Sequence, residues 1–360
     1  MHAIIGSGIS GSMILSLGKN AFGFDKAKFP GGRTSTKPFE SDYICDIGAT
    51  FFKESCKYRK DNLQYTFSCL DFLVDKGIEC IQYQYTNYKS TYFSKNGLQR
   101  ISEKLIEGKE VQFSKELVSF DVREDKKFIL YFLDGTNFIA DHLTITAPLP
   151  QALSFFPSSK HKEEWESFLQ PYFSYRKTLV AAAYWKSPSD SFMSAMKKIP
   201  RKTFLYPNQQ TEYISIESLK SGGDGFVFMV QYSSEFSDKY FDEWRKEDRS
   251  PTDFCKNAFA ESFDNFLVEN NLKDFWSETE TLPPNNWRIH KWRYAQAENP
   301  MLSKYDDLDF DSEVMNKYSD LVQRTNIRLT GDWLFGPRIE RIIAGESLWK
   351  DPRPFLNGEP

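Results

Sequence analysis

The sequence predicts an α/β fold in which a discontinuous Rossmann-type domain is joined to a second, α+β domain built on a mostly antiparallel sheet. Three observations lead to this prediction. A short apolar run, a glycine-rich turn and another apolar run fill the first 25 residues, which is the order of a βαβ unit. Alternating apolar segments separated by turn residues occupy the middle of the chain, and a strand followed by a helix returns near residue 330. A chain of 360 residues has room for two such domains.

The composition limits the classes of function. The chain carries 46 basic and 50 acidic side chains, interspersed, with a formal net charge of −4, so we expect no nucleic-acid partner. No apolar run reaches the length of about 18 residues that a membrane span needs, so we expect no membrane partner. The five cysteines show no metal-ligand spacing, and their odd number indicates a reducing compartment. We therefore expect a cytoplasmic protein without a secretory peptide or a metal site.

The first predicted unit contains a dinucleotide fingerprint. The run Gly6-Ser7-Gly8-Ile9-Ser10-Gly11 lies between a predicted strand and a predicted helix, and this context gives the GxGxxG pattern its meaning. In such a turn Gly6 permits the tight bend, Gly8 leaves room for a pyrophosphate, and Gly11 lets the helix approach the sheet. Backbone N–H groups at the helix start, around Ile9 and Ser10, would face the anion.

An acidic residue at the end of the second strand strengthens this interpretation. Asp25 follows the apolar run at residues 22–24 and lies 14 residues after Gly11, where its carboxylate could accept hydrogen bonds from ribose hydroxyls. The usual separation is about 20 residues, so the connecting helix should be short. The glycines alone are also typical of an ordinary glycine-rich turn, and the acid favours the dinucleotide site.

The later elements follow from periodicity and turn residues. The spacing of apolar residues predicts a helix over residues 61–77 and one or two helices over 238–272. Alternation predicts strands with hairpin turns between 111 and 148, and further strands at 179–185 and 226–232. A strand at 327–330 and a helix at 338–349 complete the chain.

The residues that follow Asp25 carry a family resemblance. The element Gly31-Gly32-Arg33-Thr34 begins six residues later and resembles the second fingerprint of the flavin amine oxidase superfamily. The resemblance implies FAD as the cofactor, with Gly32 and Thr34 beside the pyrophosphate and the planar fork of Arg33 on two phosphate oxygens. The run Asp25-Lys26-Ala27 also matches the family's sequence around the fingerprint, which implies that Lys26 lies in the cofactor site. A Pro-Gly-Gly turn with a surface cation is the alternative.

Further segments resemble the renalase branch of that superfamily. Asp46-Ile47-Gly48-Ala49-Thr50-Phe51 is similar to its D-x-G-A-Q-Y stretch beside the flavin, with Thr50 where Gln is usual. Leu117 would contact adenine, and Gly331-Asp332 looks like the C-terminal G-D element, after which Arg338 and Ile339 would open a helix at the isoalloxazine edge. The stretches from Ala147 to Gln151 and from Trp292 to Ala295 agree with its A-P-x-P-Q and W-R-Y-A elements.

The resemblance implies a domain organisation and a non-covalent cofactor. The FAD-binding domain would comprise residues 1–55, 95–155 and 322–360, and the substrate domain residues 56–94 and 156–321. No cysteine follows Cys255, so the C-terminal thioether of monoamine oxidases cannot form.

The implied function is that of an FAD-dependent oxidoreductase. A small planar substrate would transfer hydride to flavin N5, with O2 as the acceptor, and the implied substrates are misreduced dihydro isomers of NAD(P)H. His290, Trp292 and Tyr294 are candidate substrate residues, with core packing or a structural role as the alternative for each, and no catalytic side chain is assigned. An amine or amino-acid oxidase and a flavin-binding interaction protein without turnover are the two other candidates.

Overall fold

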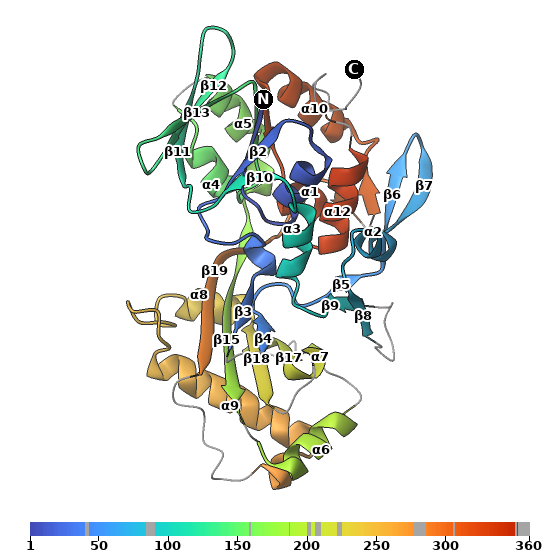
Figure 1. The fold of residues 1–360 in the computed structure, drawn as a ribbon, viewed down its shortest axis with the longest axis vertical. Helices are drawn as coiled ribbons and strands as arrows, with labels where there is room; N and C mark the ends of the chain where they lie inside the picture. The colour runs from blue at the N-terminus through green and yellow to red at the C-terminus, as the bar shows by residue number, and fades with distance from the viewer. Residues whose placement is uncertain are drawn as a thin grey trace.

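The fold is organised around a five-stranded parallel sheet that combines two N-terminal strands with three strands from later parts of the chain (Figure 1). The computed structural model describes residues 1–39, 43–83, 91–157, 160–186, 188–199, 203–205, 210–221, 225–276, 286–304, 307–349 and 351. The sheet has the order β10-β2-β1-β14-β22, and its neighbouring strands pair in parallel throughout. This arrangement confirms the predicted α/β class. The strands are β1 (His2–Ile5), β2 (Ala21–Phe24), β10 (Glu110–Gln112), β14 (His142–Ile145) and β22 (Ile327–Leu329).

Helix α1 (Ile9–Leu17) connects β1 to β2 and is nine residues long, which confirms the short helix predicted from the position of Asp25. It packs against α3 (Gln99–Leu105) and α12 (Ile339–Leu348) through a shared apolar cluster that includes Ile9, Met13 and Ile343. The first turn of α1 therefore lies directly beside the last described helix of the chain. A helix over residues 338–349 was predicted and is confirmed.

A second sheet occupies the lower part of the molecule in Figure 1 and is antiparallel throughout, with the order β16-β17-β18-β15-β19. One face packs against α8 and α9 through a ring-rich core that includes Trp185, Phe228 and Phe259. The opposite face carries Val180 and Met229, which pack against the segment around residues 45–47. The two faces alternate along each strand because successive side chains of a strand point to opposite sides. The elements are β15 (Tyr175–Trp185), β16 (Thr203–Leu205), β17 (Thr211–Ile216), β18 (Phe226–Tyr232), β19 (Trp287–Ala297), α8 (Ser234–Tyr240) and α9 (Asp253–Glu269).

The helix predicted over residues 61–77 is wrong for its first half. Strands β6 (Ser55–Lys60) and β7 (Leu63–Ser68) form a hairpin, and only α2 (Cys69–Asp75) is helical. Both loop residues, Asp61 and Asn62, have positive φ angles of 53° and 61°, the backbone of a two-residue type I′ turn. The helical spacing of apolar residues is coincidental here, since Leu63 is exposed.

The remaining elements surround these sheets. The strands predicted between residues 111 and 148 are confirmed, and three of them form an antiparallel sheet that shares a core with the parallel sheet. Residues 69–78 pack in the same cluster as α1 and α12, and the domain boundaries given above stay a prediction. No helix within the described ranges is long and apolar enough to cross a membrane. These elements are η1 (Gly32–Thr34), β3 (Thr36–Pro38), β4 (Ile44–Asp46), β5 (Phe52–Lys53), β8 (Cys80–Tyr83), β9 (Thr91–Ser94), β11 (Leu117–Val122), β12 (Phe128–Phe132), β13 (Asn137–Ala140), α4 (Leu149–Ser154), α5 (Lys160–Leu169), η2 (Gln170–Tyr172), α6 (Asp190–Lys198), α7 (Ser218–Ser221), η3 (Lys273–Phe275), β20 (Ser303–Lys304), β21 (Asp307–Asp309), α10 (Glu313–Thr325) and α11 (Asp332–Phe335).

Candidate functional site

The two glycine elements of the sequence lie against each other. Gly8 and Gly31 pair in a parallel β-bridge, and the backbone N–H of Gly31 donates to the carbonyl of Ser7 at 2.9 Å. A Cβ on Gly11 would lie 1.9 Å from the carbonyl oxygen of Gly6, whereas a Cβ on Gly8 would meet nothing closer than 3.8 Å. Gly11 therefore serves the packing of α1 on the strand, and Gly8 leaves open space at the start of the helix.

Asp25 is fixed at the end of β2, beside the glycine turn. Its carboxylate accepts hydrogen bonds from the backbone N–H of Ser7 at 2.7 Å, from the Ser7 hydroxyl at 2.6 Å and from the N–H of Ala27 at 2.8 Å. The predicted acid thus lies where β2 ends, and Lys26 after it is exposed. These contacts hold the carboxylate next to the first residues of α1.

Arg33 and Asp332, which are far apart in the sequence, form a bidentate pair. The guanidinium donates to the two carboxylate oxygens at 2.6 and 2.7 Å, and the carboxylate also accepts from the N–H of Ala297 at 2.9 Å. Burial disfavours the charge on Arg33, yet the adjacent Asp332 more than offsets this and raises the pKa of Arg33. Arg33 Nη1 also donates to the carbonyl of Tyr294 at 3.2 Å, so three predicted segments meet at this point.

The segment from Asp46 to Phe51 adjoins Arg33 and is anchored by the antiparallel sheet. The N–H of Ala49 donates to the carbonyl of Arg33 at 2.9 Å, and a Cβ on Gly48 would lie 1.9 Å from the same oxygen. Gln231 donates to the carbonyl of Gly48 at 2.5 Å. The Thr50 hydroxyl donates to that of Tyr213 at 2.7 Å, so Thr50, which replaces the usual Gln, still has a side-chain partner.

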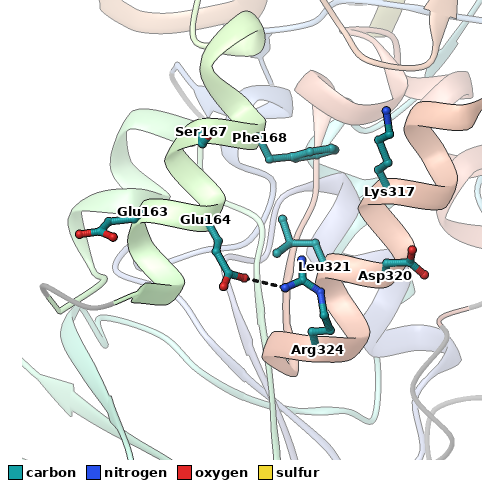
Figure 2. A pocket seen from close by; sticks show the side chains of 8 residues that line it. All are labelled: Glu163, Glu164, Ser167, Phe168, Lys317, Asp320, Leu321 and Arg324. Carbon is teal, nitrogen blue, oxygen red and sulfur yellow. Dashed lines mark hydrogen bonds and ion pairs between the residues drawn. The ribbon is translucent and has the colours of Figure 1, made fainter.

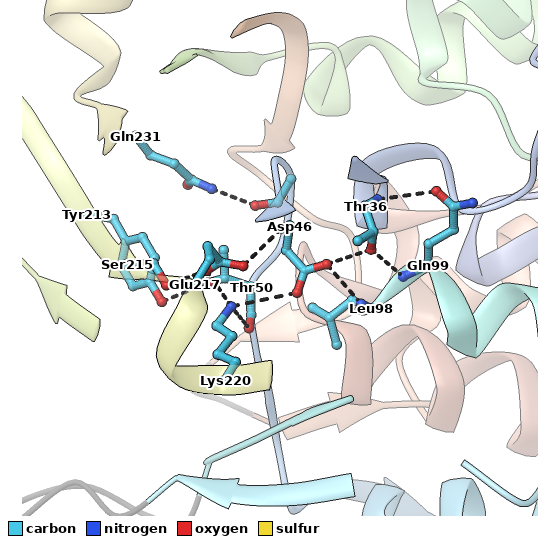
Figure 3. Close-up of polar contacts among 11 residues, drawn as sticks. Thr36, Asp46, Thr50, Leu98, Gln99, Tyr213, Ser215, Glu217, Lys220 and Gln231 are labelled. Carbon is cyan, nitrogen blue, oxygen red and sulfur yellow. Dashed lines mark hydrogen bonds and ion pairs between the residues drawn. The ribbon is translucent and has the colours of Figure 1, made fainter. Parts of the chain in front are cut away.

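A buried charge cluster lies behind this segment (Figure 3). Lys220 Nζ is 2.6 Å from Glu217 Oε1 and 3.6 Å from Asp46 Oδ2, and all three side chains are at most 6% exposed. Lys220 also donates to the Thr50 carbonyl at 3.1 Å, and Glu217 accepts from the Asp46 N–H at 2.9 Å. Burial raises the pKa of Asp46 to about 6, and the charge of Glu217 adds to this rise. The charge of Lys220 acts in the opposite direction.

Glu217, Lys220 and Gln231 were not predicted from the sequence. They lie in the part of the chain where the family resemblance is thin. The available signal was an acid and a lysine three residues apart directly after the apolar strand at residues 211–216. That spacing brings two side chains together on one helical turn, but it does not reveal the distant partner Asp46.

His290 and Trp292 share one face of β19, and Tyr294 lies where the register of β19 against β15 is irregular. The indole N–H of Trp292 donates to the carbonyl of Ile47 at 2.8 Å, and the ring centroids of His290 and Trp292 are 4.0 Å apart. Tyr294 contacts the ring of Tyr175 with centroids 5.5 Å apart. His290 and Trp292 therefore line the sheet face that is turned toward the 46–51 segment, whereas Tyr294 packs on Tyr175.

The surroundings of His290 are positively charged. Burial, followed by the charges of Arg245, Lys37 and Arg249, lowers the pKa of His290 to about 4. Within the described part of the chain, none of these three cations has a carboxylate within ion-pair distance. At neutral pH His290 is therefore an uncharged imidazole in a positive electrostatic potential.

Other predicted residues lie further from the point where Arg33 and Asp332 meet. The Ser10 side chain turns away from the glycine turn and donates to buried Glu346, which also accepts from Thr330 at 2.8 Å. Ile339 packs in the cluster of α1 and α3. Leu117 is buried in the core of the parallel sheet.

Four further predicted residues have local contacts or a local backbone role. Thr34 donates to the Gly31 carbonyl at 2.8 Å, and Gly331 has the positive φ of 142° before Asp332. Phe51 contacts the ring of Tyr213, with centroids 6.0 Å apart, and Arg338 precedes α12 as its N-cap.

A groove of about 620 Å³ between α5 and α10 contains none of the predicted residues (Figure 2). Glu164 and Arg324 form an ion pair of 3.0 Å across it. Both groups are therefore already paired with each other. Within the described residues, no cluster of three or more His, Cys, Asp or Glu could hold a metal ion.

The fold and the meeting of the two glycine elements define a dinucleotide-binding protein. Residues 65–333 match the family described as flavin containing amine oxidoreductase. The chain belongs to this family. No curated protein sequence matches it.

Comparison with solved structures agrees at the level of the fold. A structure of reduced UDP-galactopyranose mutase superposes with a TM-score of 0.59 at 12% identity, covering 96% of this chain and 93% of that chain. Wild-type putrescine oxidase bound to putrescine gives 0.55 at 10% identity, with 96% of each chain covered. A CLA-producing fatty acid isomerase from P. acnes gives 0.54 at 11% identity, with 96% and 97% covered.

The protein is therefore a flavin-dependent oxidoreductase with FAD as its cofactor, and the residues described above fit this group. Gly8 presents no side chain at the start of α1, where the first N–H groups lack partners within the helix. Asp332 already engages both Nη atoms of Arg33, so Arg33 supplies a fixed cation with its remaining N–H groups, and the predicted binding of two phosphate oxygens by an open fork is corrected. Asp25 supplies a fixed carboxylate suited to ribose hydroxyls.

Gly8→Ala is expected to leave the chain folded and to weaken FAD binding by about 10- to 100-fold, because the new methyl group meets only the space that a pyrophosphate would occupy. Gly11→Ala is the matched comparison, since its methyl group would collide with the Gly6 carbonyl and cost about 1–3 kcal/mol or more of stability. Thermal unfolding and flavin absorbance after gel filtration measure the two effects. Stoichiometric FAD in the Gly8 variant would contradict the assignment.

Proposed function

We propose that this protein is an FAD-dependent oxidase of the renalase type, which oxidises misreduced dihydro isomers of NAD(P)H. When bound, FAD would supply the hydride acceptor for such a substrate, and the hydride together with a proton from solvent would reduce O2 to hydrogen peroxide. We place the activity in the cytoplasm, because all five cysteines are free, as a reducing compartment favours.

The observation that carries the proposal is the positive potential on the face of β19 that holds His290 and Trp292. Lys37, Arg245 and Arg249 lower the pKa of His290 there. A protonated amine would be repelled at such a site, whereas a substrate with phosphate groups would be attracted. The sign of the charge therefore favours a dinucleotide over an amine.

The side chains on this face suit a planar hydride donor. Trp292 is held by the Ile47 carbonyl and offers a rigid ring system. Donation of a hydride from a dihydropyridine requires no general base, and uncharged His290 is consistent with that. Lys220 lies close to the 46–51 segment, where it forms an ion pair with Glu217 and donates a hydrogen bond to the Thr50 carbonyl.

An amine or amino-acid oxidase is the second candidate. It is favoured by the description of the family and by the similarity in fold to putrescine oxidase bound to putrescine. The carboxylate of an amino acid would also suit the positive potential. A flavin-binding interaction protein without turnover is the third candidate function, and the experiment below tests it together with the other two.

Anaerobic mixing of the purified yellow protein with possible substrates separates these candidates. We expect the 2- and 6-dihydro isomers of NADH and NADPH to bleach the flavin, and diamines and amino acids to leave it oxidised. Bleaching by amines or amino acids alone would replace the proposal by the second candidate. No bleaching by any of these compounds would favour the interaction protein.

A further inference from the structure

A groove of about 400 Å³ lies between the edge strand β19 and the loop that joins α8 to α9. In Figure 1 this loop lies beside β19, on the outer side of the lower part of the molecule. Four of the residues that line the groove are cationic: Lys246, Arg249, Lys256 and Arg288. The concave shape and the charge together indicate a site for an anion.

Arg249 and Arg288 have no carboxylate of the described residues at ion-pair distance, whereas the charge of Lys246 acts on the nearby carboxylate of Asp248. Within the described residues, Lys246, Arg249 and Arg288 form no ion pair, and Lys256 reaches Asp253 only at 4.0 Å. One carboxylate, that of Asp248, also lines the groove. It accepts from the N–H and the hydroxyl of Ser250 at 2.8 and 2.6 Å.

Arg288, which lines the groove, is held in place by backbone carbonyls. Its Nε donates to the carbonyl of Pro38 at 2.7 Å, and its Nη1 donates to that of Trp287 at 2.9 Å. The guanidinium also lies 4.9 Å from the centroid of the Phe39 ring. A cation that is fixed by neutral groups keeps its charge available for an anionic ligand and loses little conformational entropy on binding.

The positive charge of the groove extends toward the face of β19 that carries His290 and Trp292. Arg249 lines the groove and also contributes to the potential at His290, together with Arg245 and Lys37. Along β19 the order is Arg288 beside the groove, then His290, then Trp292, which contacts the 46–51 segment. A dinucleotide carries a planar ring and phosphate groups in one molecule, which matches this order of aromatic and cationic side chains.

We propose that the groove is a subsite for the phosphate groups of the substrate, with Arg249 and Lys246 as its accessible cations and Arg288 as its fixed one. This inference rests on the proposed function, in that the ligand is the dinucleotide whose nicotinamide part lies near His290 and Trp292. Binding of phosphate oxygens by charge-assisted hydrogen bonds would make the protein selective for dinucleotides over nucleosides.

The double variant Lys246→Gln and Arg249→Gln tests the inference on the holoenzyme. Both side chains are exposed, so their replacement should not disturb folding. We expect KM for the dihydro isomers of NADH to rise about tenfold or more, with kcat unchanged. KM for the corresponding dihydronicotinamide ribosides, which lack phosphate, should not change.

The control is Lys197→Gln combined with Lys198→Gln, which removes the same charge from the last turn of α6 and should alter neither KM. For the wild-type protein, added salt should raise KM for the dinucleotide and not for the riboside.

Two different failures are distinguishable. If the wild-type protein oxidises dinucleotides but the groove variant shows unchanged KM, or an equal rise for the riboside, the subsite is refuted and the proposed function stands. If no dihydronicotinamide compound is oxidised by the wild-type protein, the proposed function and the assignment of this ligand are both refuted.

Discussion

Arg33→Ala is expected to lose FAD and to be destabilised by about 3 kcal/mol, the cost of leaving a buried charge without its partner. The Asp332 side chain is 3% exposed, and in this variant its carboxylate would keep only the N–H of Ala297. Loss of this cation removes a charge-assisted donor for a phosphate oxygen, so the Kd for FAD should rise about 100-fold. Urea unfolding and fluorescence titration with FAD measure the two quantities.

A second substitution separates stability from cofactor binding. Arg33→Ala combined with Asp332→Asn removes the stranded charge and keeps an acceptor for the Ala297 N–H, so most of the lost stability should return. FAD affinity should not return, because the cation is still absent. Recovery of both properties would show that Arg33 acts only through Asp332, and an unchanged Kd in the single variant would show that it is a structural cation.

The local parts of this site could be predicted from the sequence. Glycine positions such as Gly8 and Gly11 are dictated by backbone approach within a few residues, and Asp25 is placed by the end of a strand. Only the family resemblance could predict that Arg33 and Asp332 lie close together. The two residues are far apart along the chain, so no local pattern of the sequence indicates it. The structure shows that meeting as a direct bidentate pair.

The parts that could not be predicted depend on turn chemistry and on distant packing. Apolar spacing alone suggested a helix across Asp61 and Asn62, where two positive φ angles instead reverse the chain. Three of the bonds that hold residues 46–50 come from Glu217, Lys220 and Gln231. Such a network follows from how two sheets meet, which periodicity does not encode.

Lys220→Met is expected to destabilise the protein by about 3–5 kcal/mol at neutral pH, the cost of breaking a buried charge network by removing one member. It would leave the carboxylates of Asp46 and Glu217 buried without a cation. The Thr50 carbonyl would lose its donor as well, so FAD should also bind more weakly. Urea unfolding at pH 7 measures the first effect.

Two further variants show whether charge is the cause. Lys104→Met removes a lysine from a surface pair with Glu107 and should change stability by less than about 1 kcal/mol. Adding Glu217→Gln to Lys220→Met removes one stranded carboxylate, so the double variant should be more stable than the single one. If the double variant were less stable, lost packing rather than lost charge would explain the effect.

The pH dependence supplies an independent check. The pKa of Asp46 is about 6 in the folded protein, above its ordinary value of 3.8, so between these values the folded state binds more protons than the unfolded state. This carboxyl therefore contributes stability that is fully present below about pH 4 and is lost as the pH rises through about 6. Lys220 lowers that pKa, so its removal should raise it and extend the window upward. The deficit of Lys220→Met relative to the wild type should thus be smaller at pH 5 than at pH 7, and an equal deficit at both would show that Lys220 does not neutralise buried carboxylates.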